Sequence, residues 1–201
     1  MAIEDLRAVM PGASALIKAI CDELGVARII DGRVRWDEQQ CKLSPGTRIV
    51  ALIVNALVHR TPLYQVEEFY AGQDVRRLFG PGVSAQDFND DALARALDAL
   101  AEAQPRVLFT QLALQAVLRD RIPVKTLHAD TTSRSVYGAY ESYPTQPLHI
   151  AYGNSKEHRR DLKQFLFGLV TNAEGFPVAA SVEDGNLSDK TWNQQVLESF
   201  Q

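Results

Sequence analysis

The feature that most constrains the fold is a change of sequence pattern near Arg121. Before it, apolar residues recur at the three- and four-residue spacing of amphipathic helices, as in residues 14–24. After it, residues 124–129 alternate between apolar and polar side chains, as in a half-buried strand. We therefore expect an α+β protein, with a helical N-terminal domain in residues 1–120 and a second domain in residues 121–201.

Helices in the first domain are expected where a capping residue or a proline precedes helical spacing. Ser44-Pro45 and Thr61-Pro62 are such starts, and Asn89 is a cap followed by two acids. Gly25 and the Gly80-Pro81-Gly82 segment are stops. The expected helices are residues 14–24, 45–58, 62–72, 90–100 and 105–117, with one turn at 84–88.

The second domain is expected to contain a strand, a β-hairpin and a helix. Residues 164–171 and 176–182 are rich in strand formers and flank a turn at 172–175. Ser188 is placed to cap a final helix over residues 189–200, with Asp189 in its first turn.

Composition and charge restrict the function classes. The chain is 46% hydrophobic and 23% charged, which indicates a globular protein, and its net charge of -4 argues against a generally cationic nucleic-acid coat. From Arg119 to Lys163, however, eight Lys and Arg stand against five Asp and Glu. This basic stretch is either a contact for a phosphate backbone or ordinary surface variation.

Nothing in the sequence predicts a membrane or secreted protein. Cys21 and Cys41 form no zinc-type cluster and suggest a reduced compartment. The acidic start does not resemble a signal peptide, and the apolar run 49–58 is shorter than the about 20 residues that span a bilayer. We expect a cytoplasmic protein without a membrane segment.

Asp130 is the main candidate for chemistry. It follows the expected strand and precedes Thr131, Thr132 and Ser133. A strand end holds a carboxylate rigidly, the following loop leaves room for a ligand, and carboxylate oxygens suit Mg²⁺. The alternative is that Asp130 only shapes a turn.

Two further polar segments accompany Asp130. In residues 152–164, Lys156, His158, Arg159 and Arg160 are candidates to hold phosphates, or they belong to a solvated loop with local Arg–Asp pairs. In residues 182–190, Asp184 either adds a ligand near Asp130 or shapes a turn before the final helix.

The order of these segments resembles the DDE-class insertion-sequence transposases of the IS-four superfamily, in the branch that begins with a helical domain of unassigned function. Four stretches carry the resemblance, in the same order along the chain. They are residues 88–97 (FNDDALARAL), 128–133 (HADTTS), 153–164 (GNSKEHRRDLKQ) and 184–191 (DGNLSDKT).

The resemblance implies an RNase H-like nuclease core that begins at residue 121 and is incomplete at Gln201. Asp130 matches the first catalytic and metal-binding acid. The family's second Asp lies on a strand beyond the final helix and its Glu lies later still, so neither is carried over to Asp184 or Asp189. Related enzymes use an acid on this helix, where Glu198 lies. The implied DNA-binding residues are Lys156, His158, Arg159, Arg160 and Lys163.

The implied activity is cutting and joining DNA at element ends, with transposon and target DNA as partners and a homodimer as the assembly. Two Mg²⁺ or Mn²⁺ ions serve this chemistry, and several carboxylates are needed to hold them. With Asp130 alone, we expect this chain neither to bind the ions tightly nor to cut or join DNA.

Two other functions stay open. One is a non-catalytic DNA-binding or regulatory derivative of a transposase. The other is an unrelated metal hydrolase that uses Asp130 with His128, His149 or His158, although their spacing lacks the His-Glu-x-x-His pattern.

Overall fold

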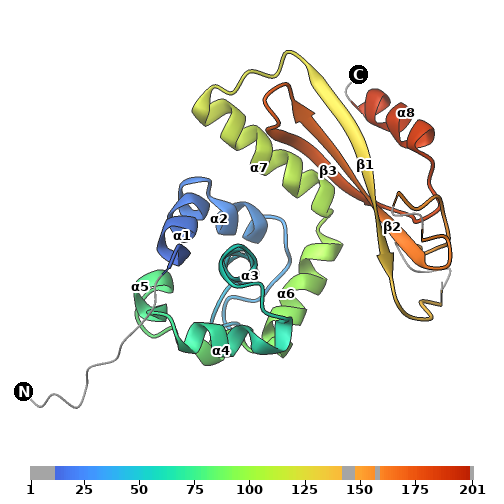
Figure 1. Cartoon of the computed structure of the whole chain (residues 1–201). Helices are drawn as coiled ribbons and strands as arrows, with labels where there is room; N and C mark the ends of the chain where they lie inside the picture. The colour runs from blue at the N-terminus through green and yellow to red at the C-terminus, as the bar shows by residue number, and fades with distance from the viewer. Residues whose placement is uncertain (1–11, 142–147, 157–158, 200–201) are drawn as a thin grey trace, which may run out of the picture. The chain divides into compact units, whose positions relative to one another are not determined.

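The computed structural model describes residues 12–141, 148–156 and 159–199, and it confirms the α+β class (Figure 1). The chain forms two compact units, one up to Leu108 and one from Phe109. Their division falls inside α7 (Pro105–Asp120), upstream of the boundary expected after residue 120. No single helix in the described ranges is long and apolar enough to cross a membrane.

The first unit is helical, as expected, but it contains more breaks than the sequence suggested. The expected helix 62–72 is a 3-10 turn followed by α4, and two short helices, α2 and α5, were not foreseen. Gly25, at φ 67°, both ends α1 and precedes α2, so the stop signal was correct but the restart was missed. The elements are α1 (Ser14–Glu23), α2 (Val26–Asp31), α3 (Pro45–Val58), η2 (Leu63–Gln65), α4 (Val66–Ala71), α5 (Val75–Phe79), η3 (Ala85–Phe88) and α6 (Asp90–Glu102).

Helix α3 runs through the middle of this unit, with α1, α2, α4 and α6 around it (Figure 1). Ser44 caps α3 by accepting a hydrogen bond from the backbone of Thr47. The buried Tyr70 of α4 packs against Phe88 and donates its hydroxyl to the carbonyl oxygen of Ala51, 2.7 Å away. This bond satisfies the one polar group of an otherwise apolar side chain. The core residues are Leu43, Ala51, Val66, Tyr70, Val75, Val83, Phe88 and Leu93.

The α2–α3 crossing depends on a glycine. The backbone N–H of Gly46 donates to Oδ1 of Asp31 at 2.7 Å. A Cβ at Gly46 would lie 2.3 Å from the carbonyl oxygen of Ala27. The two helices therefore approach too closely for any other residue at position 46.

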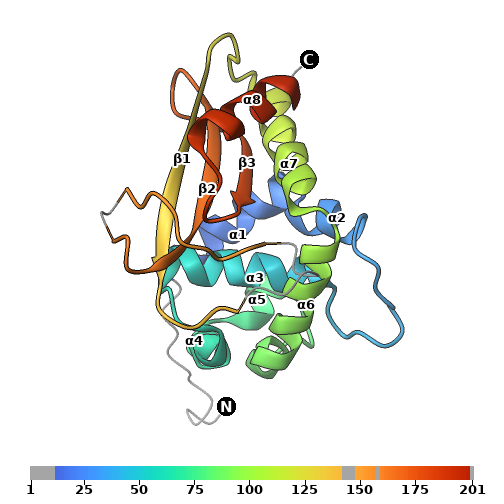
Figure 2. The same cartoon turned by 90° about the vertical axis from the view of Figure 1, so that its right-hand side faces the viewer.

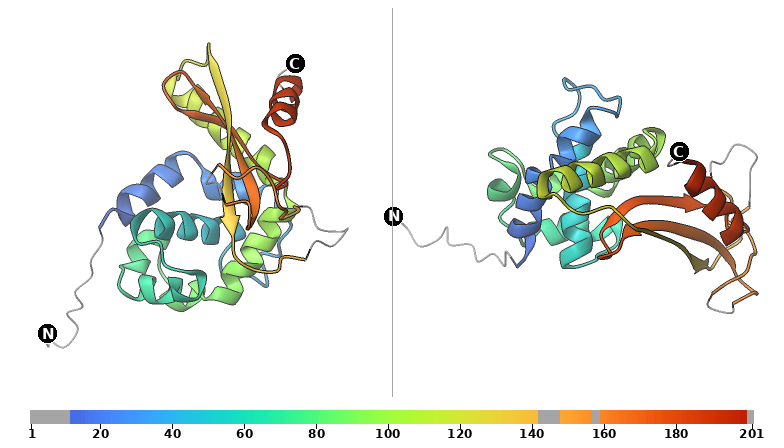
Figure 3. Two further views of the ribbon diagram at one scale, coloured as in Figure 1. Left: turned by 45° about the vertical axis from the view of Figure 1, so that its right-hand side comes forward. Right: turned by 90° about the horizontal axis from the view of Figure 1, so that it is seen from above.

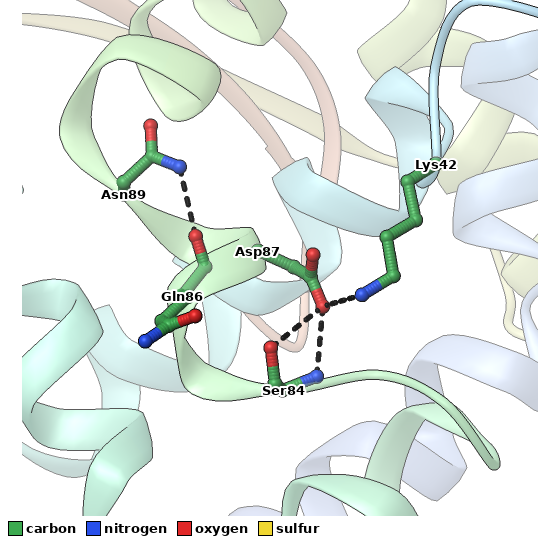
Figure 4. A network of polar contacts seen from close by, with 5 residues as sticks. All are labelled: Lys42, Ser84, Gln86, Asp87 and Asn89. Carbon is green, nitrogen blue, oxygen red and sulfur yellow. Dashed lines mark hydrogen bonds and ion pairs between the residues drawn. The ribbon is translucent and has the colours of Figure 1, made fainter.

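The residues before α6 form a polar network around Asp87 (Figure 4). One carboxylate oxygen of Asp87 accepts hydrogen bonds from the backbone and hydroxyl of Ser84, at 2.8 and 3.0 Å, and from Lys42 at 2.6 Å. Burial disfavours ionisation, but the hydrogen bonds from Lys42 and Ser84 outweigh it, so the pKa of Asp87 lies below its ordinary value. The network ties the Lys42 segment to η3, which leads into α6.

We expect Asp87→Asn to destabilise the helical unit by about 1 kcal/mol near neutral pH, the usual value of a helix-capping side chain. Because the pKa is lower in the folded state, the carboxylate stabilises the fold above its unfolded pKa, and that stability is lost as pH falls through the folded pKa. Thermal unfolding from neutral to acidic pH should show a smaller acid loss in the variant. Asp98→Asn, an exposed acid on α6, should keep the wild-type dependence, and equal curves for Asp87→Asn would contradict the assignment.

The second unit contains an antiparallel sheet in the order β1-β2-β3, comprising β1 (Leu127–Val136), β2 (Lys163–Asn172) and β3 (Pro177–Glu183). Strand β1 pairs with β2 along its full length, from Leu127 opposite Asn172 to Val136 opposite Lys163. The expected hairpin and the helix after it, α8 (Asp189–Ser199), are both present. In the sheet as described, β1 is an edge strand.

Helix α8 covers one face of this sheet (Figures 1 and 2), and the view from above shows it on a single side (Figure 3, right). Trp192 is 2% exposed, packs with Val170 and Val196, and donates its indole N–H to Oγ of Ser181 at 3.1 Å. Because strand side chains alternate, Phe167 and Leu169 of β2 lie on the opposite face, where they are 44% and 42% exposed.

Candidate functional site on the first strand

Asp130 lies on β1, but not at its end as the sequence analysis expected. The strand begins at Leu127 and continues past Asp130 to Val136, with Asp130 opposite Leu169 of β2. The carboxylate points to the face away from α8 and its side chain is 81% exposed. Asp130 is therefore held by a paired backbone on a rigid element, and its side chain is open to solvent.

The hydroxyl residues after Asp130 were interpreted as a loop, and this was wrong. Thr131 and Ser133 alternate into the α8 side of the sheet, where both are buried. The hydroxyl of Thr131 donates to Oδ1 of Asp189 at the start of α8, and Oγ of Ser133 accepts from the backbone N–H of Lys156 at 2.9 Å. The hydroxyls of both residues are hydrogen-bonded to segments that are distant in the sequence. Thr131 and Ser133 therefore extend β1 rather than end it.

Residues 149–156, here called the strap, connect Asp130 to the rest of the second unit. At one end, the carboxylate of Asp184 accepts from the backbone N–H of His149 at 2.8 Å, and Gly185 N–H donates to the carbonyl of His149 at 3.0 Å. In the middle, Ala151 and Gln164 form a two-bond antiparallel bridge. The side chain of Asp184 thus anchors the strap, a role that the sequence did not predict.

Gly153 brings the strap against the turn before α8. A Cβ at Gly153 would lie 2.1 Å from the carbonyl oxygen of Gly185, and one at Gly185 would lie 1.9 Å from the carbonyl oxygen of Gln164. The amide of Gln164, 1% exposed, fills the space beside them and donates to the Gly185 carbonyl at 2.7 Å. We did not predict Gly153, Gln164 and Gly185 as site residues. The two glycines themselves are the local sequence feature that could have indicated this close backbone approach.

The strap ends at Lys156, which contacts the candidate acid. The ammonium of Lys156 lies 3.0 Å from Oδ1 of Asp130 and also donates to the carbonyl oxygen of Thr131. The sequence placed Lys156 with the phosphate contacts and did not foresee its ion pair with Asp130. The structure brings these two predicted site residues together.

A cavity of about 330 Å³ lies between β1, the strap and the start of α8. Its lining residues mostly carry hydroxyl or amide groups, as do Ser133, Asn154 and Asn186, and they also include Lys156 and Asp189. Since Thr131 holds Asp189, the first turn of α8 is fixed to the strand that carries Asp130.

The other predicted DNA-binding residues have different surroundings. Arg159 forms a bidentate pair with Asp161 at 2.8 and 2.9 Å and lies over the ring of Tyr137. The hydrogen bond from Arg159 lowers the pKa of Asp161 to about 2, and the same bond raises the pKa of Arg159. Lys163 donates to the carbonyls of residues 139 and 140. Arg160 is exposed and pairs with no other described residue, and His158 lies outside the described residues.

The donor set at Asp130 fits one ligand of a divalent cation, not a complete site. An exposed carboxylate is a suitable oxygen ligand for Mg²⁺ or Mn²⁺. Among residues 12–141, 148–156 and 159–199, no three His, Cys, Asp or Glu side chains gather to hold a metal ion. His128 shares the exposed face of β1 with Asp130, whereas His149 lies on the strap, so the metal-hydrolase alternative gains no cluster from the described residues.

The structure thus defines a class of protein in which a helical unit precedes an antiparallel sheet with an exposed acid on its first strand. The sequence from residue 12 to residue 114 matches the family described as a domain of unknown function, DUF4277. The chain belongs to this family. No curated protein and no solved structure matches the chain.

Proposed function

We propose that this chain carries the first part of the nuclease core of a DDE-class DNA transposase, preceded by its helical domain. The observation that carries the proposal is Asp130, an exposed acid on the first of three antiparallel strands that are followed by a helix on one face. This is the element order that the resemblance implies for the start of an RNase H-like core. Cytoplasmic location, transposon and target DNA as partners, and a homodimer belong to the same proposal.

The family match supports the proposal from the other end of the chain. The resemblance led us to expect a helical N-terminal domain of unassigned function, and a family of unknown function covers residues 12–114. That match covers most of the helical unit and part of α7. The match says nothing about DNA or catalysis, so only Asp130 supports the proposed chemistry.

Asp130 would hold a divalent ion in the complete site through its exposed carboxylate. Two Mg²⁺ or Mn²⁺ ions, when bound, activate a water or a 3′-hydroxyl and stabilise the leaving oxygen of the phosphodiester. The chain's own contribution is to fix Asp130 on a paired strand and to hold the ammonium of Lys156 beside it for phosphate contact. The exposed Arg160 follows four residues later in the sequence.

The test is an excision assay with a donor plasmid in which the gene, together with any coding sequence that continues past residue 201 and supplies the remaining acids, lies between its own flanking repeats. We expect Asp130→Asn to lower excision at least about a hundredfold, as for loss of a group that stabilises transition-state charge. Glu174→Gln makes the corresponding chemical change at an exposed acid of the same unit, in the turn after β2, and should retain activity.

Unchanged excision with Asp130→Asn would overturn the proposal. Excision that is absent for the wild-type gene, together with a salt-dependent shift of an element-end duplex by the protein, would instead favour a non-catalytic, regulatory DNA-binding protein.

A further inference from the structure

The ion pair between Lys156 and Asp130 is not needed to hold the fold. Both side chains are substantially exposed, at 44% and 81%, and exposed ion pairs contribute little to stability. Lys156 is nevertheless fixed at two points. Its backbone N–H donates to Oγ of Ser133, and its ammonium donates to the carbonyl oxygen of Thr131. The pair therefore points to an effect of Lys156 on the carboxylate of Asp130 rather than on the stability of the fold.

The strap delivers this ammonium from a fixed position. Its anchors are the Ala151–Gln164 bridge, the close approach of Gly153 to Gly185, and the bond from Lys156 to Ser133. A lysine on an unanchored loop would sample many positions, whereas here hydrogen bonds hold the backbone that carries Lys156. The ammonium can leave Oδ1 of Asp130 by a side-chain rotation while the strap stays in place.

We propose that Lys156 is a positioning residue for Asp130. The ammonium of Lys156 pairs with Oδ1 of Asp130 until a divalent cation replaces it at the same oxygen. This inference rests on the proposed function, because it takes Asp130 as a metal ligand. An ammonium and a divalent ion repel each other, so they compete for Oδ1 rather than share it. The displaced ammonium then stands beside the ion, where a phosphate bound to that ion lies within reach of a lysine side chain.

The competition predicts the sign of a measurable effect. Removing the charge of Lys156 should strengthen Mn²⁺ binding at Asp130 by about two- to fivefold, the range expected for an exposed charge pair. Lys156→Arg keeps the charge and should bind Mn²⁺ as the wild type does. A side chain that only supported the fold would not produce opposite results for these two variants.

The experiment is a Mn²⁺ titration of the whole chain near neutral pH, followed by paramagnetic broadening of the backbone amide signals of Asp130 and Thr131. Lys156→Met is the main variant and Lys156→Gln a second neutral one, and the amide spectra themselves report whether each variant is folded. Lys125→Met removes an exposed positive charge of the same unit that lies outside β1 and should leave the affinity unchanged. Asp130→Asn should abolish the broadening.

The outcomes separate this inference from the proposed function. Broadening that persists in Asp130→Asn means that Asp130 is not a cation ligand, and both proposals fall. Broadening that depends on Asp130, with equal or weaker Mn²⁺ affinity in the neutral Lys156 variants, overturns only the role of Lys156. Tighter binding in those variants, with wild-type affinity in Lys156→Arg and Lys125→Met, supports it.

Discussion

Gly168→Ala is expected to destabilise the second unit by about 3 kcal/mol, the upper range for overpacking a filled core. A Cβ at Gly168 would lie 2.3 Å from two ring carbons of Trp192 and 2.5 Å from its indole nitrogen. The ring is 2% exposed, and its N–H is bonded to Ser181. The buried ring of Trp192 has no free space into which it could move, so the added methyl group must push α8 away from β2.

The measurement is urea unfolding followed by the fluorescence of Trp192, in a Trp36→Phe background that leaves it as the sole tryptophan. Gly168→Ala should unfold at lower urea and should shift the native emission to the red. Gly72→Ala is the matched control, because its Cβ would lie 3.5 Å from the nearest atom and its φ of -87° suits alanine. A wild-type midpoint and emission for Gly168→Ala would mean that α8 does not pack over this glycine.

Features decided by neighbouring residues were predictable from the sequence. The turn after β2 is one, because the side chain of Asn172 accepts from the backbones of Glu174 and Phe176, two and four residues away. The cap of α8 is another, since Ser188 accepts from the backbone of Thr191. Such local bonds depend on residue type and short spacing, both of which are visible in a sequence.

The extent of β1 was not predictable in this way. Thr131-Thr132-Ser133 is typical of a loop, and the residues that make it a strand are distant in the sequence. Thr131 is bonded to Asp189, 58 residues later, and Ser133 to Lys156, 23 residues later. For the same reason Asp130 could be chosen as the candidate acid, but its ion pair with Lys156 could not be foreseen.

We expect Gly185→Ala to cost at least about 3 kcal/mol and to detach the strap from β2. A Cβ at Gly185 would lie 1.9 Å from the carbonyl oxygen of Gln164 and 2.7 Å from that of Ala151. These are backbone atoms of a bridged pair, so they cannot rotate away as a side chain would. The Ala151–Gln164 bridge and the bond from Gln164 to the Gly185 carbonyl should both be lost.

Amide hydrogen exchange measures this loss directly, because the N–H groups of Ala151 and Lys156 are protected by bonds to Gln164 and Ser133. Both should exchange much faster in Gly185→Ala, whereas Asn186→Ala, an exposed neighbour in the same turn, should leave them protected. Unchanged exchange in Gly185→Ala would show that the strap is not anchored at this turn. Loss of the anchor should also free Lys156 from Asp130, so the Mn²⁺ affinity of any folded Gly185→Ala protein should approach that of Lys156→Met.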